Sequence, residues 1–296
     1  MDVDQKGQQR SFGNVFRSKK RRQRTADIIA FIIIIALAAV VLLPIWWIFR
    51  SSLMTSMDFF KTPPPFFPVD WLFSNYIIKP TTFDFLGFLK NSLSIVLPCV
   101  VLGTLTAIPC AYAFARLRFK GKQFIFSLCV GSMLLPTVVT LIPLYIVWAR
   151  FLGLQDTYWP LILPYLCGGG AFNIFLLRQF MRTIPKELDE AASIDGAGYL
   201  RILTTIIVPS IKPAIIVVAL LIFMLTWNDL LQQTIYINSA EKRTMILGLT
   251  AFMGSFKNDY AGMFAATCMT FMPGVVVYLF GQRYFVEGIV MTGMKN

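Results

Sequence analysis

Few residues in this sequence could carry out covalent or acid–base chemistry. The chain has 296 residues and no histidine, which removes imidazole metal sites, Ser–His and Cys–His nucleophile pairs and the HExxH zinc motif. It also has no GxxxxGK[ST] phosphate loop, so ATP binding through that motif is excluded. The cysteines stand singly in or beside apolar stretches without CxxC spacing, which predicts free, buried thiols: Cys99, Cys110, Cys129, Cys167 and Cys268. We therefore expect no catalytic residue, no metal site and no cofactor on this chain.

One charged segment, "PKELDEAASIDGAGYLRILTTIIVPSIKP", interrupts two long apolar runs. Pro185 suits a first helical position, Glu187 complements the positive start of a helix, and Gly196 and Gly198 suit a left-handed stop. The segment therefore predicts a short helix of about ten residues that ends at the glycines.

Four residues of this short helix recur at helical spacing and predict one face, on which the small alanines let another surface approach closely: Leu188, Ala191, Ala192 and Asp195. From the residues alone, an ordinary helix–turn–helix loop packed on the protein's own base is an equally good interpretation.

The composition places the chain in a membrane. It is 56% hydrophobic and 14% charged, with a mean hydropathy of +0.66, too apolar for an ordinary soluble domain. A bilayer core about 30 Å thick requires roughly 20 apolar residues of helix. Six runs qualify and predict an all-α integral membrane protein with six spans: Ile28–Phe49, Leu89–Ala115, Phe124–Trp148, Leu161–Phe180, Ile206–Leu225 and Ala261–Phe280.

The first run, although Ala36-Leu37-Ala38 resembles a signal cleavage site, is too long for a signal peptide and favours an uncleaved span. Lys and Arg concentrate before this run and between runs two and three and runs four and five, so the positive-inside rule predicts cytoplasmic termini. The segments Ser51–Gly87, Leu152–Tyr158 and Gln232–Tyr260 then lie outside, and Pro63, Pro64 and Pro65 end any continuation of the first helix. The net charge of +12 is thereby explained by topology, with contact to anionic lipid, and nucleic-acid binding is disfavoured.

Charged residues are nearly absent from the six runs. Arg178 and Asp229 stand near helix ends, where snorkelling to the interface explains them. Proton- or sodium-driven transporters usually carry ionisable groups at the bilayer centre, so that class is disfavoured and the energy must come from elsewhere.

The charged segment resembles a known family. "EAASIDGAGYLRILTTIIVP", Glu190 to Pro209, is similar to the EAA loop of ABC importer permeases, with Val208 where leucine is usual. Further matches are "NSL" at 91–93, "AYAFARLRFKG" at 111–121, "IPLY" at 142–145, "IPKELDEAASIDGA" at 184–197, "WND" at 227–229 and "QRYFVEG" at 282–288. They point to the carbohydrate-uptake branch, in the subunit resembling the six-helix maltose permease, although the final "MTGMKN" departs from its usual ending.

This resemblance implies a type I importer in the bacterial plasma membrane. Its expected partners are a second permease, two cytoplasmic ATPases that carry ATP and Mg²⁺, and an extracytoplasmic solute-binding protein. The EAA loop would be a coupling helix that docks on an ATPase through Leu188, Glu190, Ala191, Ala192, Asp195 and Gly196. The implied organisation is a basic tail (1–27), a first span with its outer loop (28–88), a transmembrane domain (89–282) containing the coupling loop (185–209), and a C-terminal tail (283–296).

A sugar pathway needs hydrogen-bonding groups and stacking surfaces within the spans. The candidates are Asn173, Trp227, Asn228, Asp229, Gln232 and Gln233; for each, a helix cap or an interhelical hydrogen bond is the alternative. The function indicated is a permease subunit that imports an oligosaccharide or related sugar. Two alternatives stay open, an importer of a non-sugar solute and a non-transporting scaffold that recruits a cytoplasmic partner.

Overall fold

The computed structural model describes residues 3–77, 84–255 and 259–293, and within these ranges it contains helices and no strand. This confirms the predicted all-α fold. The elements are α1 (Val3–Ser52), η1 (Asp58–Phe60), α3 (Phe85–Ala115), α4 (Lys122–Ser132), α5 (Thr137–Tyr145), η2 (Ile146–Phe151), α6 (Trp159–Ile162), η3 (Leu163–Cys167), α7 (Ala171–Thr183), α8 (Glu187–Ile194), α9 (Tyr199–Ile202), η4 (Leu203–Ile207), α10 (Val208–Ser210), α11 (Lys212–Trp227), α12 (Leu230–Tyr236), η5 (Ala240–Lys242), α13 (Met245–Ser255) and α14 (Tyr260–Gly293).

Four of the six predicted runs form helical segments long enough to cross a membrane: Gln23–Ser52, Phe85–Ala115, Trp159–Thr183 and Tyr260–Tyr284. The third and fifth runs are bent instead, by 96° between Lys122–Ser132 and Thr137–Phe151 and by 81° between Tyr199–Ser210 and Lys212–Trp227. Proline explains the first bend, because Pro136 caps α5 in an extended conformation and disfavours a helical residue before it. The described chain therefore has four candidate spans, or up to six if each bent pair counts as one.

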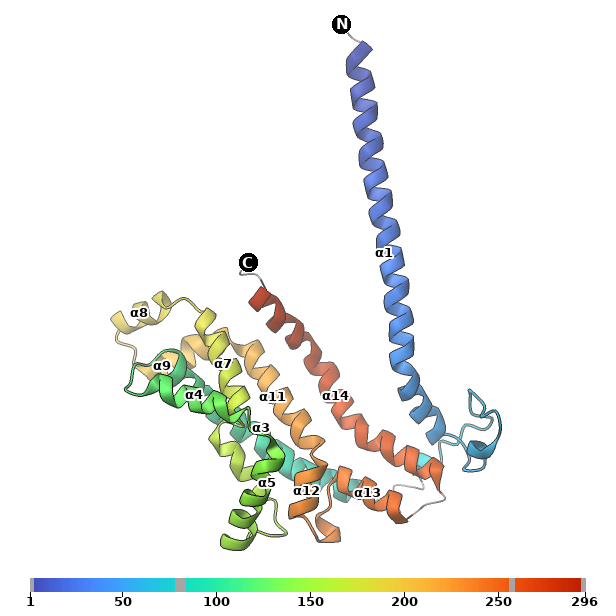
Figure 1. Cartoon of the computed structure of the whole chain (residues 1–296), viewed down its shortest axis with the longest axis vertical. Helices are drawn as coiled ribbons and strands as arrows, with labels where there is room; N and C mark the ends of the chain where they lie inside the picture. The colour runs from blue at the N-terminus through green and yellow to red at the C-terminus, as the bar shows by residue number, and fades with distance from the viewer. Residues whose placement is uncertain (1–2, 78–83, 256–258, 294–296) are drawn as a thin grey trace.

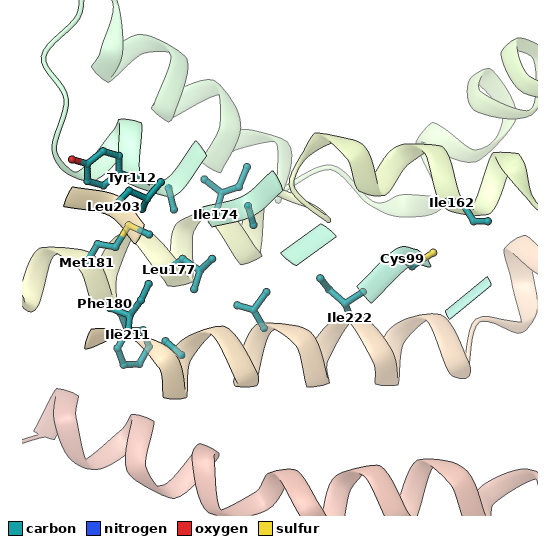
Figure 2. Packing of buried hydrophobic residues seen from close by; sticks show 14 of the residues in the cluster. Cys99, Tyr112, Ile162, Ile174, Leu177, Phe180, Met181, Leu203, Ile211 and Ile222 are labelled. Atoms are coloured by element: carbon teal, nitrogen blue, oxygen red, sulfur yellow. The ribbon is translucent and has the colours of Figure 1, made fainter. Parts of the chain in front are cut away.

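The helices pack around α3, which contacts α7 and α11, while α14 covers α11 and contacts α1. Figure 2 shows the apolar core between these helices, where Leu177, Ile211 and Ile222 are among the fully covered side chains. A close approach of backbones helps to form this core, because a Cβ added to Gly103 of α3 would lie 3.2 Å from the Cα of Gly169. Small residues at such crossings let membrane helices pack closely.

Helix α1 extends away from the bundle (Figure 1), and its apolar residues from Ile28 to Leu43 are exposed. A helix that is apolar on all sides and uncovered by its own chain is typical of a membrane span. It is continuous from Val3, so residues 3–27 of the predicted basic tail (1–27) belong to the same helix, and it ends at Ser52, before the prolines expected to stop it.

Three further predictions need correction. The outer loop predicted over Gln232–Tyr260 contains most of α12 together with η5 and α13. Its apolar stretches are long enough to form short helices but too short to cross a membrane. The cysteines are free, but only Cys99 is buried and Cys167 is exposed. Arg178 also does more than reach the interface, because its Nε donates to the Phe114 carbonyl at 3.1 Å and its guanidinium lies 3.9 Å from the centre of the Phe126 ring.

Candidate functional site

The charged segment forms α8, which lies at the edge of the bundle beside α9 (Figure 1). The helix has eight residues and begins at Glu187, so Pro185 precedes it and is not its first residue. Its end is as predicted for Gly196, which has φ +79°, whereas Gly198 has φ −76° and is not left-handed. The Gly196 amide donates to the Ser193 carbonyl at 3.1 Å and the Ala197 amide to the Ala192 carbonyl at 2.9 Å. These two bonds form a Schellman motif, which fixes the direction in which the chain leaves α8.

The outward face of α8 carries five of the six residues predicted for coupling together with a strongly exposed apolar side chain. Leu188 is 47% exposed and Ile194 87% exposed, and Glu190, Ala191, Asp195 and Gly196 are exposed beside them. Tyr199 and Leu200 of α9 extend the apolar surface. Large exposed apolar side chains gathered on neighbouring helices are typical of a surface that another molecule covers.

Ala192 was predicted to share this outward face, but it is half-buried and packs against the apolar core. Asp189, three residues earlier, also faces inward. The reason is that the side chains at i and i+3 of a short helix lie on one face, and here that face is the one that contacts the bundle.

Asp189 is held by Arg116, the residue that caps the end of α3. The Nε of Arg116 lies 3.1 Å from Oδ2 of Asp189, and its Nη2 donates to the Ile184 carbonyl at 2.8 Å. Burial raises the pKa of the Asp189 carboxyl, and the guanidinium opposes this shift only in part. Sequence patterns did not single out this pair, because its members belong to separate segments of the chain.

A second site is a cavity of about 560 Å³ next to α5, η3 and α12. Its volume lies in the range of pockets that hold small molecules. Polar groups line it beside apolar residues of α3, α5 and α6, and they are Thr137, Thr140, Tyr165, Thr226, Asp229, Gln232, Gln233 and Tyr236. No Lys or Arg is among the lining residues.

Three predicted pathway residues lie at this cavity. Asp229 is half-buried and accepts the Gln232 amide at 3.1 Å, which caps the start of α12. The side chain of Gln232 is exposed to the cavity. Gln233 is only 3% exposed, because its Nε2 donates to the Thr226 carbonyl at 3.1 Å and its Oε1 accepts from Thr244. Asp229 and Gln232 are therefore the predicted residues that line the cavity without being buried.

The other three predicted pathway residues have structural roles in this chain. The Nδ2 of Asn173 donates to the Gly169 carbonyl at 2.6 Å, and that of Asn228 to the Met224 carbonyl at 2.8 Å. The Nε1 of Trp227 donates to the Thr270 carbonyl at 3.2 Å and joins α11 to α14. None of the three lines the cavity.

Five hydroxyl residues at the cavity were missed: Thr137, Thr140, Tyr165, Thr226 and Tyr236. The available signals were the helix break at Pro136, which places Thr137 and Thr140 at a helix start, and the glycine run at 168–170, which interrupts the fourth span. Thr226 donates to the Tyr165 hydroxyl at 3.0 Å. These breaks form the cavity, as in transporters whose discontinuous helices surround the solute.

Among the described residues, no group of three or more His, Cys, Asp or Glu side chains could hold a metal ion. The described residues thus present an exposed helix at the edge of the bundle and a polar cavity next to α5, η3 and α12.

Comparisons with known proteins agree with this arrangement. Residues 100–290 match the family model described as "Binding-protein-dependent transport system inner membrane component". The chain is 32% identical over 253 residues to the probable ABC transporter permease protein YurM of Bacillus subtilis, covering 86% of this chain and 83% of that protein. It is 35% identical over 215 residues to the maltodextrin transport system permease protein MdxG of the same organism, covering 72% and 76%.

A solved structure, that of a bacterial ABC transporter involved in the import of the acidic polysaccharide alginate, contains a chain with the same fold. It superposes with a TM-score of 0.76 at 26% identity and covers 90% of this chain and 98% of that one. The predicted resemblance to ABC importer permeases with sugar-transporting relatives is confirmed. The chain belongs to the family of binding-protein-dependent transport system inner membrane components and is a multi-pass ABC importer permease.

Proposed function

We propose that this permease is the transmembrane subunit of an ATP-driven importer that takes up an oligosaccharide or a related sugar. The observation that carries the proposal is the pairing of an exposed, rigidly ended helix α8 with a polar cavity of about 560 Å³ among the spans. A transport subunit without a phosphate loop needs a surface on which an ATPase can dock and a separate path for the solute. Helix α8 would supply the docking surface, and the cavity would be part of the path.

The proposed partner at α8 is a cytoplasmic ATPase, on which ATP and Mg²⁺ are bound. Leu188, Glu190 and Ala191 face outward on α8, so they would enter a cleft of that subunit. Asp195 and Gly196 end the helix in a fixed direction. Two ATPases, a second permease and an extracytoplasmic binding protein complete the proposed assembly.

The cavity favours a hydroxyl-rich solute. Its carboxylate, amide and hydroxyl groups can each exchange hydrogen bonds with sugar hydroxyls, and the relatives that match include a maltodextrin permease. A non-transporting scaffold would need the surface of α8 but not the cavity, so the cavity favours transport.

The proposed orientation places both termini, with α8, in the cytoplasm of a bacterial cell. It is supported by the shape of the molecule, in which α8 and the C-terminal end of α14 lie toward the same end as the N-terminal part of α1, while α12 and α13 lie toward the other (Figure 1). The basic residues between the spans favour the same assignment.

The test is solute uptake by vesicles that contain the permease with its proposed ATPase, second permease and binding protein. Labelled maltotriose, diacetylchitobiose and a tripeptide are the probes. We expect uptake of a saccharide that requires both ATP inside the vesicle and binding protein outside. Uptake of the tripeptide alone would identify an importer of another solute, and an assembled complex that moves none of the probes would favour the scaffold.

A further inference from the structure

The inner end of α3 is joined to α8 by one side chain. The amide of Arg116 donates to the Tyr112 carbonyl at 2.8 Å, so its backbone belongs to the last turn of α3. Its guanidinium contacts both Asp189 on α8 and the carbonyl of Ile184, the residue that caps α7. One residue therefore connects the ends of α3 and α7 to the first turns of α8.

This ion pair is shielded from water. The side chain of Arg116 is 6% exposed and that of Asp189 is 18% exposed. Exposed ion pairs contribute little because solvent screens them, whereas removing one partner of a covered pair leaves the other charge without compensation. The pair is thus placed to fix the orientation of α8 relative to the end of α3.

Little else fixes the orientation of α8. Its backbone contacts are concentrated on the short helix α9, and most of its side chains are exposed. Its inward face has two anchors, the ion pair at Asp189 and the half-buried Ala192 one turn later. Ile184 and Ala197, which flank α8, also pack against the core, so Asp189 supplies the polar anchor on a face otherwise held by a few apolar contacts.

Helix α3 leads from this pair to the cavity. Ile95, on the same helix as the Arg116 cap, lines the cavity wall, and the helix between them has a length of about 30 Å at 1.5 Å per residue. A displacement of α8 can reach the cavity through this helix only if α8 and α3 move together.

We propose that Arg116 is a positioning residue that locks α8 to α3, so that work received by α8 moves the helix that lines the solute cavity. The proposal rests on the proposed function, because it assumes that an ATPase docks on α8. Arg116 itself does not face outward and need not touch the ATPase.

The test uses the complete reconstituted complex with Arg116→Ala, Asp189→Ala, the double variant and the exchanged pair Arg116→Asp/Asp189→Arg. Arg118→Ala is the matched control, since Arg118 is exposed two residues further along the same loop. The measured quantity is the ratio of ATP hydrolysis with loaded binding protein to hydrolysis without it, together with uptake.

We expect Arg116→Ala to lower this ratio about tenfold, the change that roughly 1.4 kcal/mol produces, while basal hydrolysis and assembly persist. The double variant should be no worse than Arg116→Ala alone, and the exchanged pair should regain much of the loss. Arg116→Lys, which keeps the charge, should retain more than Arg116→Ala. Full stimulation in Arg116→Ala, losses that multiply in the double variant, or an exchanged pair no better than the single variants would each overturn the proposal.

A photo-crosslinking residue at position 191 of α8 tests the docking of the ATPase separately from the role of Arg116. If the otherwise unchanged protein gives no crosslink to the ATPase, the docking on α8 is wrong, and the proposed function fails at that point. If the crosslink forms and the Arg116 variants remain fully stimulated, docking is correct and only the positioning role is wrong.

Discussion

Asp156 and Lys242, which are 86 residues apart, form an ion pair of 3.0 Å between Oδ2 and Nζ. Lys242 also donates to the Asp156 carbonyl at 2.6 Å, and Oδ1 of Asp156 accepts the amides of Asn238 and Ser239 at 2.9 and 3.0 Å. The Asp156 amide donates to the carbonyl of Tyr236, a cavity-lining residue, at 2.9 Å. The Asp156 carboxylate therefore joins the loop before α6 to the loop after α12.

Replacing Asp156 with Asn should loosen this connection. Hydrogen bonds from Ser239 and from the Asn238 amide, together with Lys242, hold the pKa of the Asp156 carboxyl well below its ordinary value. A carboxyl with a depressed pKa contributes stability above its unfolded pKa of about 3.9, and this contribution is lost as the pH falls below that value. We expect Asp156→Asn to cost about 1 to 2 kcal/mol near neutral pH and to weaken the loss of stability between pH 5 and 3. The measurement is the apparent Tm of the purified complex.

Glu241→Gln is the control for this variant. Glu241 is exposed and lies next to Lys242 in η5, but its side chain is not part of the contacts with Asp156. A pH dependence of Tm that is the same in Asp156→Asn as in the unchanged protein would contradict the role assigned to the carboxylate.

Gly196→Val should impair coupling, whereas Gly198→Val should not. Gly196 has φ +79° and Gly198 φ −76°, and open space surrounds both Cα atoms. Valine at 196 therefore suffers backbone strain of about 1 to 2 kcal/mol without a clash, while valine at 198 suffers none. We expect normal membrane insertion for both variants and lost uptake for Gly196→Val alone. Equal uptake by the two variants would show that the left-handed turn has no part in transport.

Glu190→Lys should weaken docking without disturbing the bundle. Glu190 is exposed on the outward face of α8, and it lies in the first turn, where an acidic residue complements the helix dipole. Reversal of its charge changes the contact surface and leaves Asp189 and Ala192 in place. We expect less ATPase to co-purify and less stimulated hydrolysis. Glu187→Lys, in the same turn and also exposed, controls for the helix dipole and should bind ATPase better than Glu190→Lys does.

Four of the six predicted spans could be identified from the sequence because the length of a span depends on bilayer thickness, and Leu89–Ala115 differs from the observed Phe85–Ala115 only at its start. The bends near Pro136 and Ile211 were not predicted, since proline within an apolar run is compatible with a kinked helix as well as with a break. Within α8, Gly196 was predicted from its conformational preference, but the inward direction of Ala192 depends on tertiary packing.

Only some of the residues that line the cavity could be predicted from the sequence. Asp229 and Gln232 are polar residues next to an apolar run, which marks them without a structure. Thr140 carries no such mark, because its hydroxyl donates to the Thr137 carbonyl at 3.0 Å, as threonines in helices commonly do. That its segment also lines a cavity follows from the bend before α5, which the sequence pattern left undetermined.

Both termini should lie on the cytoplasmic side. The six crossings predicted from the sequence and the basic loops require it, and the N-terminal end of α1 and the C-terminal end of α14 point toward the same end of the molecule (Figure 1). Green fluorescent protein fused at Met1 or at Asn296 should fluoresce in both cases, and alkaline phosphatase inserted after Pro65 should be active. Fluorescence from one terminus only would mean that one of the bent segments does not cross the membrane.

Removing the charge of Asp229 should slow transport while the fold persists. Asp229→Asn keeps an acceptor for the Gln232 amide, so the start of α12 remains capped, but the cavity loses its carboxylate. A hydrogen bond from a sugar hydroxyl to a charged group contributes about 1.5 to 3 kcal/mol, so the maximal uptake rate should fall roughly 10- to 100-fold if the carboxylate stabilises the solute in transit. Gln232→Ala removes a neutral partner and should cost less, about fivefold. Asn228→Ala is the matched control, because Asn228 neighbours Asp229 but bonds to its own helix and does not line the cavity. Uptake is measured with saturating loaded binding protein, so that delivery is not limiting, and equal rates in all three variants would place the solute path elsewhere, on the second permease.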